Sequence, residues 1–195
     1  MEAFITRTRI KRDNTSNIDT PVIDLIKSGD FQCAINMHPI RQHIAECVRI
    51  ALKNVSDTRL GEHKLVDRIT SLNGNVGSMI GTLFEYYLQE QLVKYGFSPQ
   101  QSKYDCDFIY PQNRIFDFEV KTTSHENHIF GNRSSASVPK VKDDGSFMLA
   151  VNYDPRLLHV HRIRFGWVES KHWIPQNGNG QQSRLSSDAI MLYCS

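Results

Sequence analysis

The sequence has 195 residues, with 23 Lys+Arg against 21 Asp+Glu for a formal net charge of +2, and 39% of it is hydrophobic. A chain of this length can bury roughly 70% of its unfolded surface, so it needs no disulfide or structural metal to hold a core. No apolar run approaches the ~18 residues that would span a bilayer, and the N-terminus lacks a secretory pattern. We therefore expect one domain in the cytoplasm, with no membrane partner. The net charge by itself indicates no class of partner.

Cysteine and histidine are scattered along the chain rather than grouped at metal-site spacings. The cysteines, none in a C-x-x-C pair, are Cys33, Cys47, Cys106 and Cys194. Without a secretory signal we expect reduced and mostly buried thiols. Two histidine pairs stand close in the sequence, His125/His128 and His159/His161. Because no carboxylate or cysteine completes either pair at a recognisable spacing, neither is expected to bind a metal.

The chain has helical periodicity up to about residue 97. Residues 1–14 are polar and basic, which fits either a frayed terminus or an arm on a polyanion. A helix is predicted from Pro39, because proline suits a first helical position and apolar residues then recur at spacings of three and four up to Leu52. A shorter helix is predicted over Glu62–Leu72, where Asn73-Gly74-Asn75 ends it.

A third helix has the clearest limits, with an N-cap at Ser78 and a stop at Gly96. Its apolar residues form one broad stripe, and Glu85 lies at the margin of that stripe. A glutamate in that position can face a cleft. It can equally be an ordinary solvated residue at the boundary of the stripe, and the periodicity does not choose between the two.

Strand patterns follow residue 97. Asp107–Tyr110 and Arg114–Thr122, joined by a turn at Pro111-Gln112-Asn113, are predicted to form a β-hairpin. Phe147–Tyr153 and Val160–Trp167 are two further strands, the first apolar enough for the centre of a sheet. The connection over 124–146 is long and polar, and such connections are usually functional or disordered.

The predicted hairpin concentrates acidic residues. Along its second strand the side chains alternate, with Phe116, Phe118 and Val120 on one face and Asp117, Glu119 and Lys121 on the other. On the first strand Asp105 and Asp107 share a face. Acids on adjacent strands can converge around a divalent cation such as Mg²⁺. Two plainer interpretations remain, with Lys121 as a salt-bridge partner or the whole face as a solvated surface.

The spacing of these residues resembles a known active-site signature. Asp107, eleven intervening residues and then Glu119-Val120-Lys121 at the end of an apolar strand are similar to the motif of the PD-(D/E)XK nuclease superfamily, which contains most type II restriction endonucleases. Glu85 stands where that superfamily often has an additional glutamate on a preceding helix. The resemblance covers about residues 78–190, and Cys106 stands where the superfamily name has proline.

The resemblance implies a fold and a site. The fold class is α/β (α+β), a restriction-endonuclease-like core with a mixed central β-sheet flanked by helices. The chain would be a single nuclease domain over 1–195, with a mainly helical region over 1–77 and the catalytic core over 78–195. The implied catalytic residues are Asp107, Glu119, Lys121 and Glu85. The metal ligands would be Asp107, Glu119, the Val120 carbonyl and Glu85, around Mg²⁺ or a substituting Mn²⁺. Asp105 remains an alternative to Asp107.

The implied reaction is the sequence-specific hydrolysis of double-stranded DNA by a type II restriction endonuclease, leaving 5′-phosphate and 3′-hydroxyl ends. A homodimer and a companion DNA methyltransferase are the implied partners. A structure-selective nuclease of the same superfamily, of Holliday-junction resolvase or mismatch-repair type, is the alternative among enzymes. A non-catalytic DNA-binding protein is the alternative outside them.

Two polar, glycine-containing segments carry the side chains suited to contact DNA phosphates and base edges. From the two segments and the basic stretch that follows the first, the candidate DNA-binding residues are Asn132, Arg133, Ser134, Ser135, Lys140, Gln181, Gln182 and Arg184. The alternative for the first segment is a surface loop. For the second it is a turn that leads into a closing helix.

Overall fold

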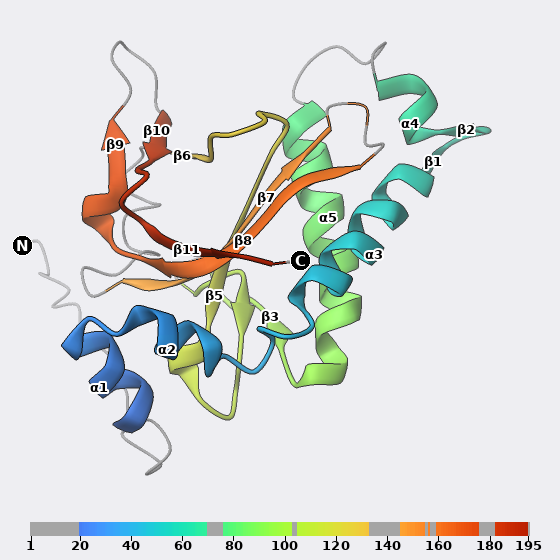
Figure 1. Ribbon diagram of the computed structural model, residues 1–195. Coiled ribbons are helices and arrows are strands. Elements are labelled where there is room, and N and C mark those ends of the chain that lie inside the picture. The colour runs from blue at the N-terminus through green and yellow to red at the C-terminus, as the bar shows by residue number, and fades with distance from the viewer. Residues whose placement is uncertain are drawn as a thin grey trace, which may run out of the picture.

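A six-stranded mixed sheet forms the centre of the computed structural model, which describes residues 20–69, 76–102, 105–132, 145–154, 156, 159–175 and 182–194 (Figure 1). The strand order is β11-β8-β7-β5-β4-β3. Only β5 and β7 pair in parallel, and the other neighbours are antiparallel. The strands are β3 (Ser98–Pro99), β4 (Phe108–Ile109), β5 (Phe118–Thr123), β7 (Ser146–Tyr153), β8 (Val160–Val168) and β11 (Ile190–Tyr193).

Helices pack on one side of this sheet, where α3 and α5 lie side by side (Figure 1). The helices are α1 (Thr20–Ser28), α2 (Phe31–Asn36), α3 (Ile44–Asp57), α4 (Leu65–Arg68) and α5 (Val76–Leu92). The last is followed by a 3-10 turn over Val93–Tyr95 and by Gly96 in the left-handed conformation. The predicted class, a mixed sheet flanked by helices with a helical N-terminal region, is confirmed.

A second, three-stranded sheet covers the opposite face of the central sheet, at the left of Figure 1. Its order is β6 (Phe130–Asn132), β10 (Gln182–Leu185) and β9 (Trp173–Pro175). The strand β7 shows why both faces are filled. Phe147, Leu149 and Val151 pack into the helix-side core, whereas Met148 and Ala150 pack toward the small sheet. The apolar run of this strand therefore reflects burial on both faces, and its predicted central place in the sheet is confirmed.

His38 anchors the N-terminal helices to the sheet from the loop between α2 and α3. Its imidazole is buried, and phenylalanine rings surround it at centroid distances of 4.6 to 5.8 Å. Nδ1 accepts a hydrogen bond from Ile40 N at 3.3 Å, so Nε2 donates to Phe116 O at 2.8 Å. Burial without a counter-charge lowers the pKa of His38 to about 3, although the bond to Phe116 O opposes that shift.

Two predicted helices differ from the structure for local reasons. The helix expected from Pro39 begins at Ile44, because the backbone before it closes tighter turns, in which Arg41 N donates to His38 O and His43 N donates to Ile40 O. The helix expected over Glu62–Leu72 begins at Leu65 as α4, because a small hairpin of β1 (Arg59–Leu60) and β2 (His63–Lys64) precedes it. Its expected end at Asn73-Gly74-Asn75 lies outside the described residues. The third helix is already formed at Val76, so Ser78 lies inside it and is not its N-cap, and its stop at Gly96 is confirmed.

Three expectations about the strand half also change. The second hairpin strand begins at Phe118 rather than Arg114, because Asn113 Oδ1 accepts from Ile115 N and caps a 3-10 turn over Arg114–Phe116. The long connection over 124–146 contains the strand β6. The alternative of a closing helix after the second polar segment is wrong for the described residues, because β10 begins at Gln182 and β11 follows it.

Other expectations are confirmed or lie outside the described residues. The four cysteines are free thiols, and Cys47, Cys106 and Cys194 are buried. The basic stretch over 1–14 lies outside the described part of the chain. Among the helices that the structure describes, none combines the length and apolar character needed to cross a membrane.

Candidate active site

A cleft of about 620 Å³ lies between the start of α5 and the end of β5. Glu85 lines its helix side, with Gly77, Ser78, Gly81 and Thr82. Val120, Lys121 and the residues that follow them in the strand line the other side, together with Phe130 and Tyr153. The sequence left open whether Glu85 faces a cleft or open solvent, and the structure places it at this cleft.

The cleft forms where β4 and β5 separate. These strands pair through Phe108 and Phe118 alone, and Asp107 immediately precedes Phe108. Beyond that pair, the Val120 N–H on the same edge of β5 donates to Asp107 Oδ2 at 2.9 Å. Asp107 is 9% exposed. The carboxylate therefore occupies the place of a strand partner, which fixes it against the backbone of the E-x-K segment.

Glu119 and Lys121 form an ion pair beside this carboxylate. Lys121 Nζ lies 2.6 Å from Glu119 Oε1 and 3.0 Å from Val120 O. The Glu119 side chain is 4% exposed, whereas that of Lys121 is 26% exposed and lines the cleft. Phe118 and Val120 pack in the helix-side core, so the alternation predicted for this strand holds from Phe118 to Lys121.

The charges around Lys121 come from the other candidate residues. Burial alone would lower the pKa of Lys121, but the carboxylates of Glu119 and Asp107, with a smaller contribution from Glu85, raise it above its usual value. The ammonium group is therefore held in its charged form by three carboxylates, from α5, from β5 and from the segment before β4. The two oxygens it contacts, Glu119 Oε1 and Val120 O, are both predicted metal ligands.

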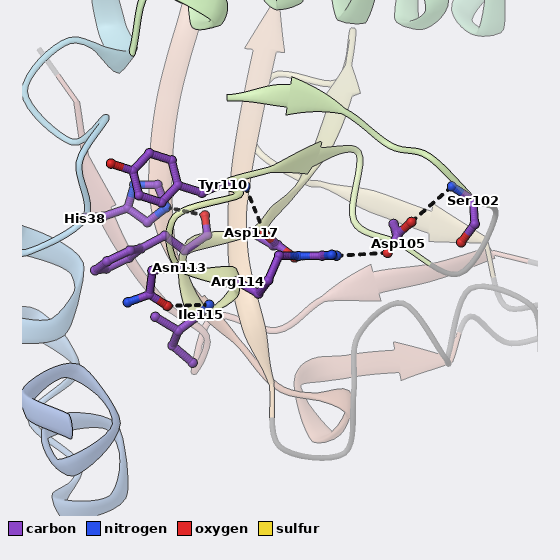
Figure 2. Close-up of polar contacts among 9 residues, drawn as sticks. His38, Ser102, Asp105, Tyr110, Asn113, Arg114, Ile115 and Asp117 are labelled. Carbon is purple, nitrogen blue, oxygen red and sulfur yellow. Dashed lines mark hydrogen bonds and ion pairs between the residues drawn. The ribbon is translucent and has the colours of Figure 1, made fainter. Parts of the chain in front are cut away.

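Asp105 and Asp117 belong to a different ion-pair network, which Figure 2 shows. Arg114 joins them, with Nη2 2.9 Å from Asp105 Oδ1 and Nε 2.6 Å from Asp117 Oδ2. Asp105 also accepts from Ser102 N, and Asp117 from Tyr110 N. Burial favours a raised pKa for Asp105, but the bonds from Arg114 and Ser102 outweigh it and the pKa is lowered.

The structure thus corrects the prediction that Asp105 shares a face with Asp107 and that Asp117 shares one with Glu119. Both positions lie in irregular backbone outside β4 and β5, so strand alternation does not apply to them. Arg114 neutralises these two acids away from Glu119. Of the two aspartates that the sequence left as alternatives, Asp107 is the one that contacts the E-x-K strand.

The oxygen groups at this position fit a hard divalent cation. Asp107, Glu119 and the Val120 carbonyl offer oxygen ligands, the type that Mg²⁺ and Mn²⁺ take in proteins. The Lys121 ammonium group already contacts two of these oxygens, which shows that the electrostatic potential beside them favours a positive charge.

Comparison with known proteins decides the family. The profile of the ScaI restriction endonuclease family matches residues 24–192, which is most of the chain. The chain belongs to the ScaI restriction endonuclease family. A curated relative, the type II restriction enzyme ScaI of Streptomyces caespitosus, is 36% identical over 90 residues, which cover 40% of this chain and 39% of the relative. The match thus spans about two fifths of that relative. No solved structure matches the chain.

In this member of the ScaI family, the two polar segments that were predicted to contact DNA are brought together. Strands β6 and β10 pair antiparallel, with Gln182 opposite Asn132 and Arg184 opposite Phe130. Phe130 also lines the cleft, so the strand pair adjoins the candidate site. Arg133, Ser134, Ser135, Lys140 and Gln181 lie outside the described residues, as do the side chains of Asn132 and Gln182.

Sequence reasoning missed a polar group that holds the segment after β5. Asn152 is fully buried in β7, where Nδ2 donates to His125 O at 2.7 Å and to His128 O at 3.0 Å. Arg164 Nη2 donates to Asn152 Oδ1 at 2.9 Å. These bonds tie the loop between Lys121 and β6 to the sheet. An amide inside an otherwise apolar strand was the signal that could have identified it.

Proposed function

We propose that this chain is a type II restriction endonuclease of PD-(D/E)XK type, which hydrolyses double-stranded DNA at a specific sequence with Mg²⁺ and leaves 5′-phosphate ends. One observation carries the proposal. In a chain of the ScaI restriction endonuclease family, Asp107 and Lys121 both contact the backbone of Val120, and Lys121 also contacts Glu119, at the wall of a cleft. These are the three residues of the D…E-x-K motif, and they meet at one point of the sheet.

The proposed ligands of the metal are Asp107, Glu119 and the Val120 carbonyl, with Glu85 across the cleft for a second ion or a bound water. When bound, a divalent cation neutralises charge on the scissile phosphate and lowers the pKa of a coordinated water. Lys121 now contacts two of these oxygens, so it must release them and turn into the cleft that it already lines. There its ammonium group orients the attacking water and stabilises phosphate charge.

The paired strands β6 and β10 are the proposed DNA-contacting element beside the cleft. Arg184 lies in β10 opposite Phe130, and Phe130 reaches the cleft wall. The residues proposed to bind DNA here are Asn132, Arg133, Ser134, Ser135, Lys140, Gln181, Gln182 and Arg184. The pairing of the two segments supports this proposal, because it brings both strands next to the cleft that holds the proposed scissile phosphate.

The proposed domain organisation and partners follow from the same assignment. The chain acts as one nuclease domain over 1–195, and the shared core supports this, because Ile35 and Ile44 from the helical region pack in the same cluster as Phe118 and Phe147 of the sheet. A homodimer suits a palindromic site, since two-fold symmetry in protein and DNA then coincide. A companion DNA methyltransferase and a location in the cytoplasm belong to the same proposal.

Incubation of the protein with a sequenced plasmid and Mg²⁺ tests the proposal. Discrete fragments whose mapped ends share one sequence and carry 5′-phosphates support it. Preferential cutting of branched or mismatched DNA would support the structure-selective alternative instead. Tight binding without cutting would support a non-catalytic DNA-binding protein.

A further inference from the structure

The hairpin between β7 and β8 carries a cluster of metal-ligating side chains outside the cleft. Asp154 follows the end of β7, His159 precedes β8, and His161 is the second residue of β8. One ligand atom from each lies within 4.8 Å of the others. The rings of the two histidines lie 4.6 Å apart and nearly perpendicular. The sequence offered no carboxylate at a recognisable spacing for this histidine pair, and the hairpin turn supplies one.

The backbone of this hairpin holds the three side chains together. Tyr153 pairs with Val160, and Asp154 N donates to His159 O at 2.9 Å, so the two strand ends are joined directly beside the cluster. The Asp154 carboxylate accepts from Arg156 N through Oδ1 at 2.8 Å, which orients it within the turn. These bonds place the three residues side by side and orient the Asp154 carboxylate, and they exist without a metal.

The ligand types select the class of ion. Two imidazole nitrogens and one carboxylate oxygen suit Zn²⁺ and the neighbouring transition metals, whereas Mg²⁺ prefers all-oxygen sites. Atoms that share one tetrahedral Zn²⁺ at about 2.0–2.1 Å lie roughly 3.4 Å apart. Because His159 and His161 are exposed, rotation of their side chains closes the remaining distance without disturbing the core.

We propose that Asp154, His159 and His161 form a second metal site, which binds Zn²⁺ or a similar transition-metal ion with three protein ligands and a fourth position open to water. This site is separate from the proposed Mg²⁺ site and does not depend on the proposed nuclease function. The ion joins the end of β7 to the start of β8. It therefore fixes the position of Tyr153, which precedes Asp154 and lines the cleft.

Titration with Co²⁺ in the presence of excess Mg²⁺ tests this site, because Co²⁺ in a tetrahedral N/O site absorbs visible light and Mg²⁺ does not. Wild-type protein should bind one Co²⁺ with such absorption, and Zn²⁺ should displace it. The double variant His159→Ala/His161→Ala loses two ligands. Loss of even a group that only orients a ligand costs about 10–100-fold in affinity, so the double variant should bind at least about 100-fold more weakly.

The other histidine pair provides a matched control. His125 and His128 lie 4.5 Å apart between ring centroids, nearly the same separation, and the three-residue cluster does not include them. The double variant His125→Ala/His128→Ala should therefore bind Co²⁺ like the wild type. Asp154→Asn keeps the shape of the side chain and should weaken binding. It also provides the test if the histidine double variant does not fold.

Several results would overturn the proposal. They are an absence of Co²⁺ absorption in the wild type, unchanged binding by folded His159→Ala/His161→Ala, and loss of binding in His125→Ala/His128→Ala alone. A Zn²⁺-dependent rise in melting temperature, present in the wild type and absent in Asp154→Asn, is an independent readout that does not use DNA cleavage.

Discussion

Lowering the pH from about 7.5 to 5 should destabilise the fold through His38. The imidazole is neutral in the folded protein because it lies among phenylalanine rings, and its nearest polar partners are backbone groups. Its pKa is about 3 in the fold and 6.5 in the unfolded chain. The contribution of the neutral imidazole to the free energy of unfolding is therefore complete above pH 6.5 and is lost progressively as the pH falls toward 3.

The size of the effect follows from these two pKa values. Below pH 6.5 the unfolded chain takes up a proton that the folded protein does not, which costs roughly 1.4 kcal/mol for each pH unit. Between pH 7.5 and 5 the free energy of unfolding should therefore fall by about 2 kcal/mol through this residue. Other titrating groups add to the total, so the effect must be isolated by comparison with a variant.

Urea unfolding of the wild type and of His38→Gln at both pH values measures the effect. Glutamine retains a donor for Phe116 O but does not titrate, so the variant should be less stable at pH 7.5 and should lose about 2 kcal/mol less than the wild type on acidification. Equal pH dependence in the wild type and His38→Gln would refute the reasoning.

Three further predictions concern the stability of variants at Arg114, Gly145 and Gly81. Arg114→Ala removes the guanidinium partner of buried Asp117 and should lower the free energy of unfolding in urea by about 1–3 kcal/mol, toward the lower figure because Arg114 is partly exposed. Lys53→Ala breaks an exposed ion pair and should change the free energy of unfolding little. Equal effects of the two variants would contradict the role of Arg114. Gly145→Ala should cost at least about 2 kcal/mol, because φ is +87° and a Cβ would lie 2.5 Å from Trp167 Nε1. Gly81→Ala lies inside α5, and its Cβ would meet Thr122 Oγ1 of β5 at an ordinary 3.5 Å, so it should be neutral or stabilising by up to about 1 kcal/mol in the same urea assay. A large loss there would show that the helix has no room beside β5.

The sequence was informative where burial alone determines the structure. The apolar stripe of α5 and the apolar run of β7 record which side chains face the core, so both elements were predicted and β7 was placed at the centre of the sheet. The alternation of the side chains next to Glu119 between the two faces of the strand was predicted for the same reason. Glu85 could be placed at the margin of a helix but not at a cleft, because the cleft exists only once α5 packs beside β5.

Contacts between distant segments could not be predicted from the pattern. His38 reaches Phe116 O, a partner 78 residues away in the chain. Arg114 draws Asp105 and Asp117 out of the strand alternation. The pairing of β6 with β10 joins two segments that looked like independent loops. Each of these outcomes depends on a tertiary partner, which local propensity does not encode.

The most direct test of the central claim is the rate of plasmid cleavage with Mg²⁺ by Asp107→Asn and Asp105→Asn, compared with the wild type. Asparagine at 107 keeps an oxygen for the Val120 N–H but loses the charge that a cation needs, so cleavage should fall by at least about 100-fold. Asp105→Asn alters a carboxylate that Arg114 already holds, and it should cut at nearly the wild-type rate. Cleavage at the wild-type rate by a folded Asp107→Asn variant, or loss of cleavage in Asp105→Asn alone, would contradict the assignment of the active site.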